Sequence, residues 1–452
     1  MKVLKFGGTS VGSAERLQNL VKIINDGQKK IIVLSAISGT TNKLSEISNL
    51  VKKNDITQAM SKAIELESLY LDISKKLLKT DEFINKAVNF IKNIFTEINN
   101  HIQLNFSNEI KNVILSKGEL LSTNLFHFLL QEHKIENIII PALSFMKTCK
   151  NYEPDLEYIK ENLNNEIKNL KNSNLYITQG FICLNDEGAI SNLGRGGSDY
   201  SASLIAEALQ TDEVEIWTDI DGFHNNDPRF VDDTFVIKKL SFEEAAELAY
   251  FGAKILHPAS IRPCQRSNIN VRLKNTLNPS AYGTIISKEY VNTGIKAVAA
   301  KDNITIIKIK STHMLMAHGF LMKIFAVFAH FKTSIDMIAT SEVSVSVTID
   351  NFTYLNEIVH ELKSFSSVKI NNNQSIICVV GDFRSDQKGV VNKIFTTLQE
   401  IPIRMISYGG NKFNISLCVD SIYKTSTLQY LNNLVIDEFN RTNNLITCNN
   451  EK

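Results

Sequence analysis

The sequence predicts an α/β protein that combines a domain built on a mostly parallel sheet with two C-terminal copies of a ferredoxin-like unit. Three observations lead to this prediction. Residues 3–34 read as strand, small-residue turn, helix and buried strand, which is the order of a βαβ unit. Strand-like and helical runs then alternate as far as about residue 290. The C-terminal third of the chain contains an internal repeat.

The first domain is predicted over residues 1–290, opening with a strand at 3–6, a glycine-rich turn and a helix over about 14–26. Residues 55–131 contain few turn formers and have apolar positions at helical spacing, so we expect several inserted helices there. The other expected strands are 31–34, 138–141, 175–181, 214–218 and 269–273, and the other expected helices are 198–209 and 241–251.

The repeat is visible in the residues themselves. The segment IDMI at 335–338 matches IRMI at 403–406, and residues 345–350 match 415–420. Each copy reads strand, helix, strand, strand, helix, which predicts a ferredoxin-like module. The expected modules span 300–372 and 373–448, with strand 303–310 as an alternative member of the second. Such modules either bind a small ligand where they meet or serve only as packing units.

Composition excludes several classes of function. The 452 residues include 49 Lys plus Arg and 48 Asp plus Glu, so the net charge of +1 provides no global attraction to nucleic acid or to a membrane surface. The six cysteines form no CxxC pair, which argues against a zinc ribbon or a redox motif. No signal-peptide hydrophobic region follows Met1, and the apolar stretch 319–331 is too short to span a bilayer. We therefore expect a soluble cytoplasmic protein.

Two glycine-rich turns carry the clearest chemical signals. Lys5 ends a strand and is followed by Gly7 and Gly8, whose backbone N–H groups would be able to approach a polyphosphate. The chain contains no Gly-Lys dipeptide, so this turn is not a P-loop. Later, Arg195 stands between glycines, where its guanidinium is suited to bind a carboxylate. Ser198 or Asp199 would also serve as the cap of the helix that follows.

Other charged positions have a structural explanation when each is taken alone. Asp219 lies in an acidic turn after a strand, and Lys254 follows a glycine that would end a helix. Glu119 is expected in the first turn of a helix that starts at 117–120, where an acid is favourable without any ligand.

Taken together and in this order, these segments resemble the aspartokinases, the branch of the amino-acid kinase family that phosphorylates the side-chain carboxylate of aspartate. The resemblance covers essentially the whole chain and is nearest to the monofunctional, lysine-sensitive branch. It implies a three-layer amino-acid-kinase domain with a mostly parallel sheet, followed by two ACT modules of βαββαβ type. The matching segments are KFGGTSV at 5–11, LSAISGTTN at 34–42, KGELLS at 117–122, TQGFI at 178–182, LGRGGSDY at 193–200, WTDIDG at 217–222, DPR at 227–229, FGAKILHP at 251–258 and TSEVSVS at 340–346.

The resemblance implies that ATP and L-aspartate give 4-phospho-L-aspartate and ADP, the first step of lysine, threonine and methionine biosynthesis. Mg²⁺ is expected on the phosphates, bound largely through them and water, so no metal-ligand residues are predicted. The implied catalytic residues are Lys5 and Asp199; the implied aspartate ligands are Thr41, Glu119, Arg195 and Ser198; the implied ATP ligands are Lys5, Phe6, Gly7, Gly8, Thr218, Asp219, His224, Arg229 and Lys254. His224 departs from the tyrosine that many relatives carry at this position.

The resemblance also implies an L-lysine site in the repeat region and a homodimer formed through the ACT modules. Asp336 and Glu342 would pair with the ammonium groups of the amino acid. Ala317 departs from the serine that relatives can carry, which bears on the strength of lysine feedback. The implied effector ligands are Met314, Gly319, Phe320, Leu321, Ile335, Asp336, Ser341 and Glu342.

Two alternatives differ in kind. One keeps the fold but changes the substrate to glutamate, acetylglutamate or a nucleoside monophosphate. The other is a non-catalytic amino-acid sensor with an inactive kinase domain, against which the presence of Lys5, Arg195 and Asp199 argues.

Overall fold

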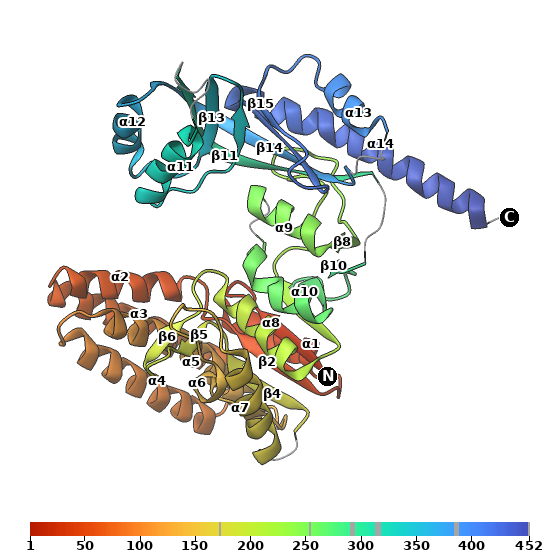
Figure 1. Cartoon of the computed structure of the whole chain (residues 1–452). Coiled ribbons are helices and arrows are strands. Elements are labelled where there is room, and N and C mark those ends of the chain that lie inside the picture. Colours follow the sequence, from red (N-terminus) through yellow and green to blue (C-terminus); the bar gives the residue numbers. More distant parts are fainter. Residues whose placement is uncertain (171–172, 253–254, 290–293, 312–317, 384–387, 451–452) are drawn as a thin grey trace. The chain divides into compact units, whose positions relative to one another are not determined.

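The computed structural model describes residues 1–170, 173–252, 255–289, 294–311, 318–383 and 388–450. Its contacts divide the chain into two compact units, shown in Figure 1. The first unit comprises Met1–Phe223, Lys238–Phe242 and Ile255–Tyr290, and the second comprises His224–Ile237, Glu243–Lys254 and Val291–Lys452. Segments 224–237 and 243–254, which the sequence placed in the first predicted domain, therefore cluster with the C-terminal half of the chain.

The first unit is built on a sheet with strand order β3-β4-β2-β1-β7-β9-β10-β8. The strands are β1 (Lys2–Phe6), β2 (Lys30–Leu34), β3 (Ile138–Ile139), β4 (Leu175–Gln179), β7 (Glu213–Thr218), β8 (Lys239–Ser241), β9 (Asn270–Asn275) and β10 (Thr284–Ser287), and a separate hairpin joins β5 (Ile182–Leu184) to β6 (Ile190–Asn192). Strands pair in parallel from β3 to β9, and β10 runs antiparallel to β9. The predicted mostly parallel sheet is confirmed, whereas β5, β6, β8 and β10 were not predicted.

Helices cover this sheet on both faces. The helices are α1 (Ala14–Ile24), α2 (Thr40–Lys52), α3 (Ile56–Leu77), α4 (Asp81–Ile102), α5 (Asn108–Glu132), α6 (Ala142–Phe145), α7 (Leu156–Asn169), α8 (Gly197–Leu209) and α10 (Arg262–Ser267). One apolar core joins α1–α5 to Leu4, Phe6 and Ile32 on one face of the sheet. Because side chains alternate along a strand, Val3 and Lys5 face the other way, towards α8. The three-layer architecture follows from this arrangement.

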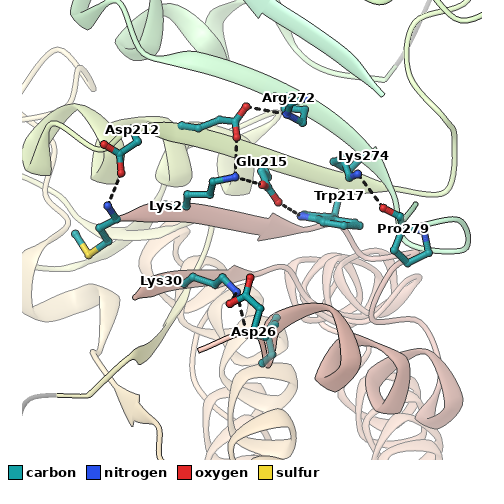
Figure 2. Close-up of polar contacts among 12 residues, drawn as sticks. Lys2, Asp26, Lys30, Asp212, Glu215, Trp217, Arg272, Lys274 and Pro279 are labelled. Carbon is teal, nitrogen blue, oxygen red and sulfur yellow. Dashed lines mark hydrogen bonds and ion pairs between the residues drawn. The ribbon is translucent and has the colours of Figure 1, made fainter. Parts of the chain in front are cut away.

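The face of the sheet at β1, β7 and β9 carries a ladder of charges (Figure 2). Lys2 Nζ lies 2.9 Å from Glu213 and 2.8 Å from Glu215. Glu213 also accepts a hydrogen bond from Arg272 Nε (2.8 Å), and Glu215 accepts one from Trp217 Nε1 (3.0 Å). Both glutamates are buried, so these partners offset the cost of removing two carboxylates from water. The ladder fixes β1, which carries Lys5, against its neighbour β7.

The second unit contains an antiparallel sheet with strand order β12-β13-β11-β14-β16-β15. Its elements are β11 (Ile295–Lys310), α11 (Phe320–His330), β12 (Ile338–Thr340), β13 (Ser344–Ile349), α12 (Leu355–Lys363), β14 (Ser367–Gly381), α13 (Val390–Thr397), β15 (Ile403–Ser407), β16 (Asn414–Asp420) and α14 (Lys424–Asn450), together with α9 (Phe242–Phe251). The repeat predicted from the sequence is present: strand, helix, strand, strand, helix occurs twice.

Strands β11 and β14 are long enough to serve both copies of the repeat. Residues 305–310 pair with β13, and the same part of β11 pairs with the start of β14. Residues 295–301 pair instead with 376–381, next to β16. Residues 305–310 thus pair with strands of the first copy and 295–301 with a strand next to the second copy, and the module boundaries stay a prediction. Two separate apolar cores lie under the two halves of the sheet.

Segment 224–237 is attached to α14 through buried asparagines. Asn432 Oδ1 accepts hydrogen bonds from the side-chain amides of Asn225 (2.8 Å) and Asn226 (3.4 Å), and its own amide donates to Asp233 O (2.9 Å). Asn225 O accepts from Val298 N on β11 (2.8 Å). Because unpaired buried amides are costly, this network explains why the segment folds with the C-terminal half of the chain.

Within the described ranges, no helix combines the length and the apolar character that crossing a membrane requires.

Candidate active site

A cleft of about 540 Å³ opens beside the C-terminal ends of β1 and β2, where ligands of parallel α/β sheets commonly bind. It brings together Lys5, Gly8, Thr41, Glu119, Arg195, Ser198 and Asp199, which were all proposed from the sequence. It also adds residues that the sequence analysis did not single out, among them Asn192 and Phe181. A second hollow of about 420 Å³ along α2, lined by Asn42, Ser45 and Glu46, contains none of the proposed residues.

Lys5 and Asp199 form the central charged pair of the cleft. Lys5 Nζ lies 2.6 Å from Asp199 Oδ1, and both side chains are about nine-tenths buried. Lys5 is the second-to-last residue of β1, and Asp199 lies in the first turn of α8. The pair therefore holds an ammonium group at the floor of the cleft in a fixed position, with its charge balanced when no ligand is bound.

The glycine turn after β1 packs directly against the turn after β2. Gly8 O accepts a hydrogen bond from Ser38 N (3.1 Å), and Gly7 N donates to Trp217 O (3.1 Å). A side chain on Gly8 would place its Cβ 3.0 Å from Ala36 O, so this close approach of two backbones requires glycine. The predicted role of this turn in exposing backbone to the cleft stays a proposal.

The turn before α8 presents Arg195 to the cleft. Gly194 and Gly196 both have φ near +72°, a conformation that favours glycine, and Gly196 is the N-cap of α8. The sequence interpretation of Ser198 or Asp199 as the cap was wrong, because the left-handed turn at Gly196 starts the helix earlier. Both residues instead lie in the first turn, at the helix end that favours anions. The Arg195 side chain is exposed and lines the cleft.

Glu119 lies in the middle of α5, not at its start. The expected helix start at 117–120 was wrong, because Ser107 caps the helix by accepting a hydrogen bond from Ile110 N (3.1 Å). Glu119 is 3% exposed, and its Oε1 accepts from Ala36 N (3.2 Å). Burial raises the pKa of this carboxyl to about 8, opposed by the backbone hydrogen bonds. Among the described residues, its Oε2 has no hydrogen-bond partner, so the cleft holds a buried acceptor suited to an ammonium group.

Gly118 allows α5 to approach the turn after β2. Replacing it with alanine would place a Cβ 2.9 Å from Ala36 Cβ and 3.3 Å from Thr40 Cγ2. Alanine normally stabilises a helix interior by about 1 kcal/mol, but here the turn must move, and Glu119 with it. We expect Gly118→Ala to raise KM for the amino-acid substrate about tenfold while the circular dichroism spectrum is retained. Gly410→Ala, where the added methyl group meets open space, is the control, and an unchanged KM would contradict this account of Gly118.

Thr41 follows Thr40, whose side chain contacts one of the inserted helices. The neighbouring Thr40 hydroxyl lies 2.8 Å from the hydroxyl of Tyr70, which is fully buried on α3. Burial raises the pKa of Tyr70 well above its usual value, so its hydroxyl stays protonated. The inserted helix α3 therefore contacts the residue next to Thr41, in addition to contributing to the apolar core.

The residues proposed for the nucleotide are only partly brought together. Thr218 ends β7, the neighbour of β1, and Asp219 follows it; Thr218 Oγ1 lies 3.1 Å from Asp219 Oδ1. Phe6 has no exposed surface and stacks on Trp217 at 5.8 Å, so only its backbone is available to a ligand.

His224 and Arg229 belong to the second unit. His224 Nδ1 lies 3.1 Å from Thr234 Oγ1, and Arg229 is an exposed residue paired with Asp227 at 2.6 Å. Lys254 lies outside the described residues.

The proposed effector residues lie in the first half of the C-terminal sheet. Phe320 and Ile335 pack in one apolar core, Gly319 is the N-cap of α11, and Leu321 is exposed. Ser341 and Glu342 are exposed in the turn before β13, and Met314 lies outside the described residues. The Asp336 side chain is 1% exposed and is contacted by Lys301 and Tyr250, two residues that the sequence analysis did not find.

Comparisons with known proteins agree with this architecture. The amino acid kinase family matches residues 1–275, and an ACT domain matches residues 377–434. Lysine-sensitive aspartokinase 3 of Escherichia coli is 33% identical over 92% of this chain and 95% of its own length. Aspartokinase 2, chloroplastic, of Arabidopsis thaliana is 32% identical over 92% of this chain and 81% of its own length.

Solved structures give the same result. The crystal structure of E. coli aspartokinase III in complex with aspartate and ADP (R-state) has a TM-score of 0.79, with 32% identity over 95% of this chain and 98% of that chain. The structure of the same protein in complex with lysine and aspartate (T-state) has a TM-score of 0.82, with 32% identity over 96% and 99%. The chain therefore belongs to the amino acid kinase family and, within it, to the aspartokinases.

Proposed function

We propose that the cleft of the first unit is where the chain transfers the γ-phosphoryl group of ATP to the side-chain carboxylate of L-aspartate. The chain is an aspartokinase, and the residues of this cleft would carry out its phosphorylation of aspartate. The observation that carries it is the buried Lys5–Asp199 pair, at 2.6 Å, in one cleft with a buried acid and an exposed arginine. These charges are complementary to an amino acid and a phosphate bound side by side.

Aspartate would be oriented by charge. Arg195 would bind its α-carboxylate through two parallel N–H···O bonds, and Glu119 would accept from its α-ammonium group. The hydroxyls of Thr41 and Ser198 line the same cleft and would add hydrogen bonds. The side-chain carboxylate, which is already ionised at neutral pH, would then point towards Lys5. It needs no general base, so alignment carries most of the catalysis.

The phosphoryl group would be stabilised from the floor of the cleft. Lys5 Nζ would lie beside the transferring oxygens, and Asp199 would keep this ammonium in place. The backbone of Gly8 and the N-terminus of α8 would add dipoles that favour an anion, whereas the N–H group of Gly7 already donates to Trp217 O. Mg²⁺ bound to the phosphates would supply further charge neutralisation. The cleft suits a metal that arrives with ATP, because Asp199 is engaged by Lys5 and Glu119 has a pKa raised by burial.

The remaining nucleotide ligands are proposed from where these residues stand in the sequence and, for two of them, from the strand that they end or follow. Thr218 ends β7, the strand next to β1, and Asp219 follows it, which supports a position near the glycine turn. His224, Arg229 and Lys254 follow along the chain and are proposed as nucleotide ligands from the resemblance of the sequence alone. We place the reaction in the cytoplasm.

Regulation by L-lysine is proposed for the second unit. The E. coli relative is named as lysine-sensitive and has been solved in complex with lysine. In this chain Asp336 offers a buried carboxylate, and Glu342 offers an exposed one within the same half of the sheet. Lysine carries two ammonium groups, so two acids in one region favour it over amino acids with a neutral side chain.

A homodimer formed through the ACT modules is proposed from the edges of the C-terminal sheet. Strands β12 and β15 end the strand order, and each has an unpaired edge in the described part of the chain. Ile338 on β12 and Ile406 on β15 are 44% and 45% exposed, at matching positions of the repeat. Because β12 and β15 also contact each other, the proposal rests on the two exposed isoleucines, whose apolar surface favours packing against a second copy.

The test is release of ADP by the purified chain with ATP, Mg²⁺ and L-aspartate, with and without millimolar L-lysine and then L-threonine. Aspartate-dependent release that lysine suppresses supports the enzyme, the substrate and the effector. Turnover that neither amino acid affects rejects lysine regulation and keeps the kinase. Turnover with L-glutamate or N-acetyl-L-glutamate instead of aspartate favours another substrate, and no turnover with any of them favours the non-catalytic sensor.

A further inference from the structure

Asp336 is the most buried of the acids proposed to receive an effector's ammonium group, and the chain's own residues already occupy it. Its side chain is 1% exposed, and its Oδ1 accepts from Lys301 Nζ and from the Tyr250 hydroxyl, both at 2.7 Å. Its Oδ2 is buried and has no hydrogen-bond partner among the described residues. An incoming ammonium group would therefore meet one open acceptor on a carboxylate that another ammonium group already neutralises.

Lys301 has a second acidic partner with which it can stay paired when it leaves Asp336. Its Nζ also lies 2.9 Å from Asp350, whose side chain is 39% exposed, and 4.6 Å from the centre of the Tyr250 ring. The contact with Asp350 lies closer to solvent than the contact with Asp336. Losing Asp336 would thus leave Lys301 with a charged partner and an aromatic face, so displacing it does not strand a buried cation.

The second copy of the repeat has a different ion pair at the positions that correspond to Asp336 and Asp350. The repeat aligns Asp336 with Arg404 and Asp350 with Asp420. In the second copy, Arg404 pairs directly with Asp420 at 2.5 Å, so a cation built into the module satisfies the acid. In the first copy both positions are acidic, and the balancing cation comes from β11 instead. The first copy is therefore the one that offers an acid to an external ammonium group.

We propose that Lys301 is a tethered competitor of the amino-acid effector: its ammonium group occupies Asp336 and thereby sets the concentration of L-lysine at which the site fills. The inference rests on the proposed role of the second unit as the lysine site. Two ammonium groups on one carboxylate repel each other, so lysine must either displace Lys301 or bind against its charge. Removing the Lys301 charge should therefore tighten lysine binding.

The arrangement also connects the effector site to α9. Tyr250 lies near the end of this helix and donates to the same carboxylate oxygen as Lys301. It is four residues before Lys254, a proposed nucleotide ligand. An ammonium group that takes over Asp336 competes with this phenol as well, so filling of the site changes a contact of α9.

The experiment measures L-lysine binding by calorimetry in the full chain and in three variants. Lys301→Met, which keeps the length of the stem but removes the charge, is expected to bind lysine about tenfold more tightly than the parent. Lys301→Arg, which retains a cation, is expected to bind with parental or weaker affinity. Lys310→Met, on an exposed lysine of the same strand, is expected to behave as the parent.

Several outcomes would overturn the inference. Parental or weaker binding by Lys301→Met would show that Lys301 supports the site rather than competing for it. Equal gains by Lys301→Met and Lys301→Arg would show that charge is not the cause. If Lys301→Met folds poorly because Asp336 is left unpaired, the rise in melting temperature on adding lysine replaces calorimetry, and it must exceed that of the parent.

Aspartate-dependent ADP release is measured on the same samples, so failure of the kinase proposal is seen separately. If neither the parent nor Lys301→Met binds lysine, both the lysine assignment and the competitor are rejected.

Discussion

Replacing Lys5 with methionine is expected to lower kcat for aspartate phosphorylation by a factor of about 10³ or more while leaving the chain folded. The reason is that Lys5 Nζ is the buried cation of the cleft, held 2.6 Å from Asp199. The aspartate carboxylate needs no general base, so the reaction depends on this positive charge beside the transferring phosphoryl group. Methionine has a similar length and fills the same space without the charge. The measurement is steady-state ADP release at saturating ATP and aspartate.

Lys86→Met is the control, because Lys86 also pairs with an acid, Glu82 at 2.6 Å, but both side chains are exposed on α4. It should retain kcat within about twofold, since it touches none of the proposed ligands. Lysine binding by Lys5→Met, measured by calorimetry, should equal that of the parent, because the proposed effector residues belong to the other unit. A Lys5→Met variant with near-parental kcat would remove Lys5 from the catalytic residues.

Asp199→Asn tests the proposed positioning role of the partner. Loss of the carboxylate leaves the buried Lys5 without its counter-charge and less well held, but the ammonium group itself remains. We therefore expect a smaller fall in kcat than for Lys5→Met. The double variant should be little worse than Lys5→Met alone, because the aspartate acts through the lysine. Additive losses would instead mean that Asp199 contacts the reacting groups directly.

The parts of the site that the sequence predicted share one property: their chemistry is local. Lys5 with its glycines and Arg195 with its glycines are each contained in a few consecutive residues at the end of a strand or the start of a helix. Such positions converge in parallel sheets regardless of the details of packing. Glu119 lines the same cleft as the other proposed residues, but its predicted place in the helix was wrong, because Gly118 resembles a helix boundary and is in fact a close-packing position.

What the sequence did not show depends on contacts between distant residues. Lys301 and Asp336 are brought together by strand pairing in the second unit, and no short motif contains both. The attachment of segment 224–237 to the C-terminal half rests on Asn225, Asn226 and Asn432, and asparagine is so frequent in this chain that these three do not stand out. Pairing of buried amides is decided by three-dimensional position, which periodicity does not report.

Replacing Glu119 with glutamine is expected to raise KM for aspartate by about 10- to 150-fold with a smaller change in KM for ATP. Glutamine preserves the shape of the side chain, and its oxygen can still accept from Ala36 N, but it removes the charge that an α-ammonium group would meet. Ser122→Ala on the same helix is a suitable control, since it removes a hydrogen bond to Ser35 O (2.8 Å) without altering charge. Equal effects on both KM values would point to a general distortion of the cleft.

The same variant should change how stability depends on pH. Burial raises the pKa of Glu119 from 4.5 to about 8, so the folded protein binds this proton more tightly than the unfolded chain does. Between these two values the unfolded chain gains by ionising, and the parent's free energy of unfolding therefore falls as pH rises. Glutamine has no such proton. Urea unfolding should show Glu119→Gln to be similar to the parent near pH 4 and more stable than the parent, by up to a few kcal/mol, near pH 9.

Substrate binding should show the opposite pH dependence in the parent. In the empty cleft at neutral pH, Glu119 is largely protonated, because its pKa is about 8. An ammonium group beside it favours the ionised form, so aspartate must bind with loss of this proton. KM for aspartate is therefore expected to fall as pH rises from about 6 to 8 and to level off above that, whereas KM of Glu119→Gln should be flat over the same range. If the parent and the variant shared one pH profile, the titrating group would lie elsewhere, and Glu119 would be a structural acid that stabilises the turn at Ala36 rather than a ligand of the substrate.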